Sequence, residues 1–260
     1  MASYRLTYSA ACGNPSSIVV GADGNLWFGD WFGSHAIHRI TTGGLISNFG
    51  GLSTHVANLT VGPDGNIWAG TEGGGANALV SIDSYGHEVV HTTPGYINAT
   101  ALAVGADAQL WYYSYSAPTT VRSMSTAGVP GASIATNDSM CFGAHGKIMI
   151  SGPDGNLWYP TRYQNTLQKV NPLTKTITSI PLQSNALAEG VTIGPDGNIW
   201  LTESGSDTIA RVTSSGMVTE WSRTSIGINS SATPMDITTG PDGNMWFAEY
   251  GSNSIGKFVL

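Results

Sequence analysis

Acidic side chains recur beside apolar runs in this chain, and together they could hold a divalent cation or exchange a proton. Glu189, Glu203, Asp236 and Glu249 stand at such places in the second half, and Asp30 occupies the matching place in the first half. Carboxylate oxygens bind Mg²⁺ and Ca²⁺, and a buried or crowded carboxyl can act as a general acid or base. We expect Glu189, Asp236 and Glu249 to ligate magnesium or calcium, if any cofactor binds. The alternative is that each acid only caps a loop.

Cationic, imidazole and aromatic side chains form a second candidate set. We expect Glu189, Glu203 and His145 to be the catalytic groups, with His145 or Glu203 as the base. A bound ligand would contact aromatic rings and cationic or imidazole groups, since these supply apolar area and fix orientation. The expected ligand-binding residues are Trp31, Tyr115, Arg162, Tyr163, Tyr250 and His55.

Composition limits the partners of this chain. Its 260 residues carry 17 acids and 10 bases, a net charge of −7, and charged residues are only 10% of the total. Nucleic acids and anionic membranes are bound through Lys and Arg, so neither is expected as a partner. No apolar run is long enough to cross a membrane, and residues 1–10 lack the pattern of a signal peptide. We expect a monomer, either cytoplasmic or mature and secreted, with a small-molecule ligand or substrate.

A repeated phrase sets the positions of all these residues. It runs Gly-Pro-Asp-Gly-Asn-apolar-Trp, with variations, and its copies begin 41, 43, 47, 42 and 46 residues apart. This period with strand-like content is typical of propeller blades of four strands. The phrase predicts a hairpin turn with Gly at the position of positive φ, between a first and a second strand. The six copies span residues 21–27, 62–68, 105–111, 152–158, 194–200 and 240–246.

The order of strands within a blade predicts where a site lies. Every repeat turn falls at one end of its blade, so the start of each first strand and the end of each second strand fall at the other. We call this the site end. Glu189 and Asp236 precede or begin first strands, whereas Glu203 and Glu249 end second strands. The acids of the fifth, sixth and first blades are therefore expected to lie together.

Each of the six repeats is expected to have a first, a second and a third strand. Only five of the repeats are followed by a fourth strand. Residues 4–8 resemble residues 217–221, which are an expected fourth strand. We therefore predict one domain over residues 1–260, an all-β, closed six-bladed propeller of four-stranded antiparallel blades. The N-terminal strand would complete the last blade and remove the exposed edges.

Two stretches carry a resemblance to a known family. Residues 234–249 with 253–258, and residues 194–203 with 208–213 and 216–221, resemble the blade consensus of the virginiamycin B lyase (streptogramin lyase) family. The resemblance implies magnesium-assisted elimination at an ester of a cyclic depsipeptide, with a histidine base and acidic metal ligands. Family members have the sequence Pro-His just before the first strand of their late blades, and they have seven blades. This sequence has Glu189 and Met235 at the histidine positions and six repeats.

Two functions remain open from the sequence, beside a third possibility, a scaffold propeller with no small-molecule site. One is a metal-assisted lyase or hydrolase acting on a lactone, an ester or another cyclic natural product. Glu189-Gly190 before a first strand also resembles calcium-dependent lactonases of the gluconolactonase type. The other is a non-catalytic propeller that binds a small molecule, a glycan or a protein. Propellers host many functions, so the fold does not decide between them.

Overall fold

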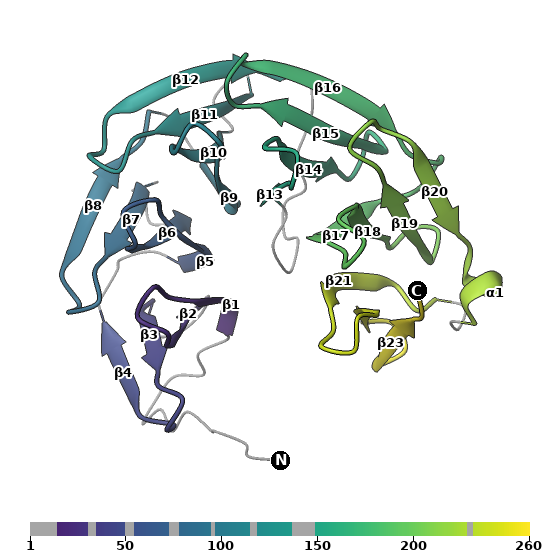
Figure 1. Ribbon diagram of the computed structural model, residues 1–260, viewed down its shortest axis with the longest axis horizontal. Coiled ribbons are helices and arrows are strands. Elements are labelled where there is room, and N and C mark those ends of the chain that lie inside the picture. Colours follow the sequence, from purple (N-terminus) through teal and green to yellow (C-terminus); the bar gives the residue numbers. More distant parts are fainter. Residues whose placement is uncertain are drawn as a thin grey trace. The chain divides into compact units, whose positions relative to one another are not determined.

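The computed structural model describes residues 15–30, 35–49, 55–72, 78–94, 97–114, 119–136, 149–227 and 231–260. These residues form six antiparallel sheets in which the strands follow one another in chain order, the pattern of a six-bladed propeller (Figure 1). The predicted fold class is therefore confirmed. The described chain divides into two compact units, Met1–Val104 with Ala108–Ser133, and Gly105–Asp107 with Ile134–Leu260.

The first unit holds the first three blades. Blade 1 consists of β1 (Pro15–Val20), β2 (Leu26–Asp30), β3 (Ile37–Ile40) and β4 (Ile46–Phe49). Blade 2 consists of β5 (His55–Val61), β6 (Ile67–Glu72), β7 (Ala78–Ile82) and β8 (Glu88–Thr92). Blade 3 consists of β9 (Ile97–Val104), β10 (Leu110–Ser114), β11 (Thr120–Met124) and β12 (Pro130–Ala135), whose last two residues are assigned to the second unit.

The second unit holds the last three blades. Blade 4 consists of β13 (Ile150–Ser151), β14 (Leu157–Thr161), β15 (Thr166–Asn171) and β16 (Thr176–Pro181). Blade 5 consists of β17 (Ala188–Ile193), β18 (Ile199–Glu203), β19 (Thr208–Val212) and β20 (Val218–Trp221), followed by α1 (Arg223–Ile226). Blade 6 consists of β21 (Pro234–Thr239), β22 (Met245–Glu249) and β23 (Ser254–Phe258). No helix in the described part of the chain is long and apolar enough to cross a membrane.

The sixth sheet has three strands among the described residues, which leaves β23 at its edge. Residues 4–8, predicted to be the fourth strand of this sheet, lie outside the described residues, so ring closure stays a prediction. The prediction of a single domain over residues 1–260 is likewise untested, because the two units are described separately.

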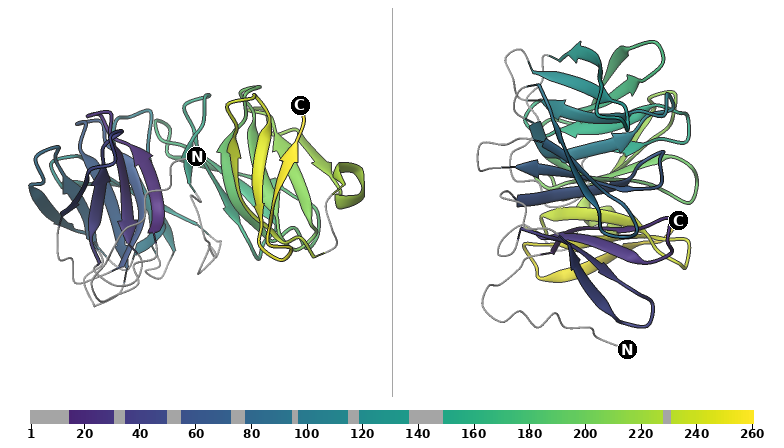
Figure 2. Two further views of the ribbon diagram at one scale, coloured as in Figure 1. Left: turned by 90° about the horizontal axis from the view of Figure 1, so that it is seen from below. Right: turned by 90° about the vertical axis from the view of Figure 1, so that its left-hand side faces the viewer.

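The repeat turns form as the sequence predicts. Gly155 has a φ of 76°, which a residue with a side chain rarely adopts. The third copy of the repeat has Ala108 at this place, with a φ of 56°. In Figure 2 the strands of each unit run side by side, and the hairpin turns lie at the two ends of the strands.

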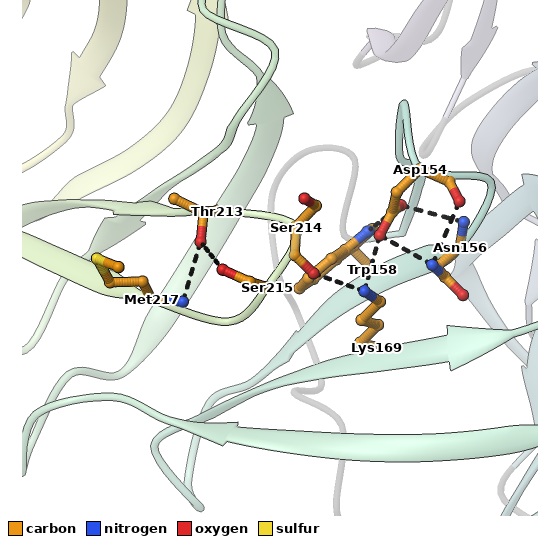
Figure 3. A network of polar contacts seen from close by, with 8 residues as sticks. All are labelled: Asp154, Asn156, Trp158, Lys169, Thr213, Ser214, Ser215 and Met217. Atoms are coloured by element: carbon orange, nitrogen blue, oxygen red, sulfur yellow. Dashed lines mark hydrogen bonds and ion pairs between the residues drawn. The ribbon is translucent and has the colours of Figure 1, made fainter.

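The aspartate of the repeat turn accepts a hydrogen bond from the tryptophan of the same repeat, as in Trp27, Trp68, Trp158, Trp200 and Trp246. Trp158 Nε1 donates to Asp154 Oδ1 over 3.1 Å, and Lys169 Nζ lies 2.9 Å from Asp154 Oδ2 (Figure 3). The same ammonium stacks over the Trp158 ring and donates to the backbone oxygen of Ser214 in the next blade. The turn, the core aromatic and the neighbouring blade are thus connected. Five of the repeat tryptophans are fully buried: Trp27, Trp68, Trp111, Trp158 and Trp200.

Candidate functional site

A β-bulge places the site residues at the start of each late blade. Between the pairs Ala188–Glu203 and Val191–Leu201, two residues of β17 face one residue of β18. The two residues are Glu189 and Gly190, which face Thr202, and β21 bulges in the same way at Met235 and Asp236. Bulges redirect side chains and are common beside active sites.

The bulge in β17 directs Glu189 toward the preceding blade. Its Oε1 lies 3.1 Å from Nη2 of Arg162, which follows β14. The Glu189 side chain is 1% exposed, whereas that of Arg162 is 26% exposed. A buried carboxylate therefore holds a guanidinium whose outer part reaches solvent. Such a group can bind a carboxylate or an ester carbonyl through fixed N–H donors.

Ser204 and Tyr163 complete this arrangement. Ser204 Oγ lies 3.1 Å from Glu189 Oε1 and 2.9 Å from the backbone oxygen of Leu187, either of which can accept its proton. Tyr163 is 65% exposed, and the Arg162 Cζ lies 5.8 Å from its ring centre. The result is a fixed cation beside an exposed aromatic ring. We call Arg162, Tyr163, Glu189 and Ser204 the Arg162 site.

Glu203 lies at the end of β18 and is fully buried. Its Oε2 accepts a hydrogen bond of 2.5 Å from Gln183 Nε2 and one of 3.3 Å from Ser206 Oγ. Burial raises the pKa of Glu203 to about 7, although the Gln183 hydrogen bond opposes this, and the neighbouring carboxyl of Glu220 adds to the increase. The carboxyl is thus poised to exchange a proton near neutral pH, but it is enclosed.

Glu249, the equivalent of Glu203 in blade 6, is occupied by its own hairpin. Ser252 Oγ and Ser254 Oγ donate to its Oε2 over 2.7 Å and 2.8 Å. Asp236 is exposed, and its Oδ1 accepts from the backbone N–H of Ile237 over 2.9 Å. The loop-capping alternative therefore describes Glu249 well.

Residues 50–260 match the model of the virginiamycin B lyase family. The chain belongs to this family. The recognition made from the blade phrases is confirmed.

Solved structures share the fold of this virginiamycin B lyase family member. The search of curated proteins finds no match. A catalytically inactive histidine-to-alanine variant of virginiamycin B lyase from Staphylococcus aureus, solved with quinupristin, is 23% identical, with a TM-score of 0.81. The match covers 98% of this chain and 84% of that one. A streptogramin B lyase structure is 23% identical over 97% and 85% of the two chains, with a TM-score of 0.78. Hydrazine synthase from Kuenenia stuttgartiensis is 14% identical over 95% and 83%, with a TM-score of 0.71.

The family resemblance implies a magnesium site, and the described residues do not supply one. No three His, Cys, Asp or Glu side chains in the described ranges lie close enough to share a metal ion. The expected ligands Glu189, Asp236 and Glu249 have the separate surroundings given above. Glu189 is neutralised by a guanidinium, which is a poor setting for a cation ligand.

The remaining predicted site residues are less informative. Tyr250 is exposed just after β22. His55 begins β5 in the first unit, where its ring centre lies 4.8 Å from that of His35. Asp30, also in the first unit, lies 3.9 Å from the buried His38. His145, Trp31 and Tyr115 lie outside the described residues, so their assignments stay predictions.

Sequence reasoning missed three residues of this region, namely Gln183, Ser204 and Glu220. Gln183 belongs to the connection between blades 4 and 5, which has no motif. Glu220 could have been found, because alternation along β18, β19 and β20 places it on the same sheet face as Leu201 and Glu203.

Proposed function

We propose that this chain binds a small molecule bearing a carboxylate or an ester carbonyl at the Arg162 site, without needing ring-opening chemistry. The observation that carries the proposal is the ion pair of 3.1 Å between the buried Glu189 and the partly exposed Arg162. Glu189 stands where the resemblance implies a histidine, and its ion pair with Arg162 removes its use as a base. The pair instead holds a partly exposed guanidinium in a fixed place beside the exposed ring of Tyr163.

A ligand bound to a structural relative is a suitable first probe of this ligand class. The inactive Staphylococcus aureus variant, in which alanine replaces a histidine, was solved with quinupristin. Binding in that protein thus persists without the histidine. The present chain has Glu189 and Met235 at the positions where the resemblance implies histidines, so retention of ligand without turnover is the parallel expectation.

Calorimetric titration with quinupristin tests the proposal. Replacing Arg162 alone leaves a buried carboxylate unpaired, which costs about 3–5 kcal/mol. The informative variant is therefore the double change Arg162→Met with Glu189→Gln, which removes both charges. We expect it to lose at least about tenfold in affinity, the equivalent of 1.4 kcal/mol.

Arg223→Met is the matched control, because Arg223 is an exposed arginine of α1 in the same unit. The control should bind as the unaltered protein does. Equal affinities for the double variant and the control would contradict the assignment of Arg162.

A second candidate, ester elimination, is favoured by the pKa of about 7 of Glu203. In that reaction Glu203 would take a proton from the carbon next to the ester-bearing carbon. A carbon–carbon double bond would form as the carbon–oxygen bond breaks and the carboxylate leaves. Because Glu203 is fully buried, the connection that contains Gln183 would first have to move.

A further inference from the structure

The connection between blades 4 and 5 is fastened by two acids that share one glutamine. The backbone N–H of Gln183 donates to Glu220 Oε1 over 2.9 Å, while its side-chain Nε2 donates to Glu203 Oε2. Nε2 also lies 3.0 Å from Ser206 Oγ. Gln183 is thus held by β18, by β20 and by the hairpin that joins β18 to β19.

The same connection reaches the Arg162 site at its other end. The backbone oxygen of Leu187 accepts from both the N–H and the hydroxyl of Ser204. Ser204 in turn contacts Glu189, which holds Arg162. The residues between Gln183 and Leu187 therefore join the acid pair to the site by a continuous chain of contacts.

When Glu203 and Glu220 are both ionised, the two carboxylates have one hydrogen-bond donor too few. Glu203 Oε1 is enclosed and receives no hydrogen bond from the described residues. A proton on either carboxyl supplies a donor between the two acids and removes their repulsion. Burial and the proximity of Glu220 raise the pKa of Glu203 accordingly.

The cations on neighbouring strands are engaged elsewhere. Arg162 pairs with Glu189, Lys169 with Asp154 and Arg211 with Asp196. Asp207, in the hairpin after β18, accepts the backbone N–H groups of Ser231 and Thr233. Arg223 lies in α1, beyond the end of β20. Glu220 is therefore the charged group that acts on Glu203 at this point.

We propose that Glu203, Gln183 and Glu220 form a proton-operated latch that orders residues 182–188 and so regulates the Arg162 site. With one proton on the acid pair the latch is closed, and Ser204 and Glu189 hold Arg162 in place. Without this proton, the carboxylates of Glu203 and Glu220 repel each other on either side of Gln183. Residues 182–188 then become less ordered. The regulatory half of this inference rests on the function proposed above; the latch itself does not.

Hydrogen exchange tests the latch without any ligand. Protection factors of the amides of Gln183, Ala186 and Ser204 should fall as the pH rises through about 7. Glu203→Gln, which keeps a neutral group of similar shape, should remove this pH dependence. Glu220→Gln should move the transition to lower pH. Glu249→Gln, the equivalent change in blade 6, should leave the transition where it is.

Quinupristin titration of the same proteins tests the regulation. Affinity should be at least about fivefold weaker at pH 8 than at pH 6, and the same at both in Glu203→Gln. Protection that does not vary around pH 7, or that varies equally in Glu203→Gln, would overturn the latch. If protection changes as expected but quinupristin does not bind at either pH, the latch stands and the proposed function fails.

Discussion

At the scale of the residue, three glutamates at the site end of the second unit behave differently because of their partners. Glu189 faces a guanidinium, Glu203 faces another acid, and Glu249 accepts two serine hydroxyls. Glu189 therefore holds Arg162 through an ion pair. Glu203 can keep a proton near neutral pH. Glu249 is a loop cap.

The raised pKa of Glu203 predicts how stability varies with pH. Its pKa is about 7 in the folded protein and 4.5 is the ordinary value, so the folded chain keeps a proton that the unfolded chain releases between them. The free energy of unfolding should therefore fall as the pH rises from about 4.5 to about 7, and stay lower above that.

Glu203→Gln should remove this loss, making the variant more stable than the unaltered protein at pH 8 but not at pH 4.5. Urea unfolding at the two pH values measures the difference. A variant that is less stable than the unaltered protein at both pH values would contradict the raised pKa of Glu203.

The partners of these acids could not be read from the sequence. The repeat phrase predicted the order of strands, and the fourth strand expected at residues 217–221 is observed as Val218–Trp221. The place of Glu189 before a first strand was also predictable. That its bulge points it at Arg162 of another blade was not, because it depends on how two sheets pack.

At the scale of the element, the first strands of blades 5 and 6 touch at Gly190. A Cβ there would lie 2.6 Å from the backbone oxygen of Met235 and 2.8 Å from the Cα of Asp236. Thr202 Oγ1 accepts the Gly190 N–H and donates to the same Met235 oxygen over 2.8 Å. Close approach of β17 and β21 therefore requires glycine at this position.

Gly190→Ala should separate the two strands and cost about 1–3 kcal/mol, the usual range for overpacking. Thermal unfolding measures the cost. Gly43→Ala is the control, because its Cβ would meet only Thr41 Oγ1 at 3.8 Å. An equal, small effect of both changes would show that β17 and β21 can move apart freely.

At the scale of the whole molecule, the family and the six blades agree with the sequence, while closure is still to be tested. Sheet pairing in the described residues leaves β23 without a second neighbour, and Ile255 on it is 67% exposed. Residues 4–8 are predicted to cover this edge, on the resemblance to residues 217–221. An uncovered edge invites pairing with other chains.

Deleting residues 1–9 should therefore lower the melting temperature by at least about 5 °C, since 1 kcal/mol corresponds to about 2–4 °C in a domain of this size. It should also promote self-association, measured by light scattering. A truncated chain that melts with the full chain and stays monodisperse would remove the N-terminal strand from the sixth blade.

The central claim is that this family member holds an ester-bearing ligand at the Arg162 site without opening it. Mass spectrometry of quinupristin recovered after incubation with the protein, with Mg²⁺ or with EDTA, tests it most directly. The account predicts that the ligand is recovered intact in both cases. A linearised product that forms with Mg²⁺ and disappears with EDTA would contradict it and assign a metal-assisted lyase instead.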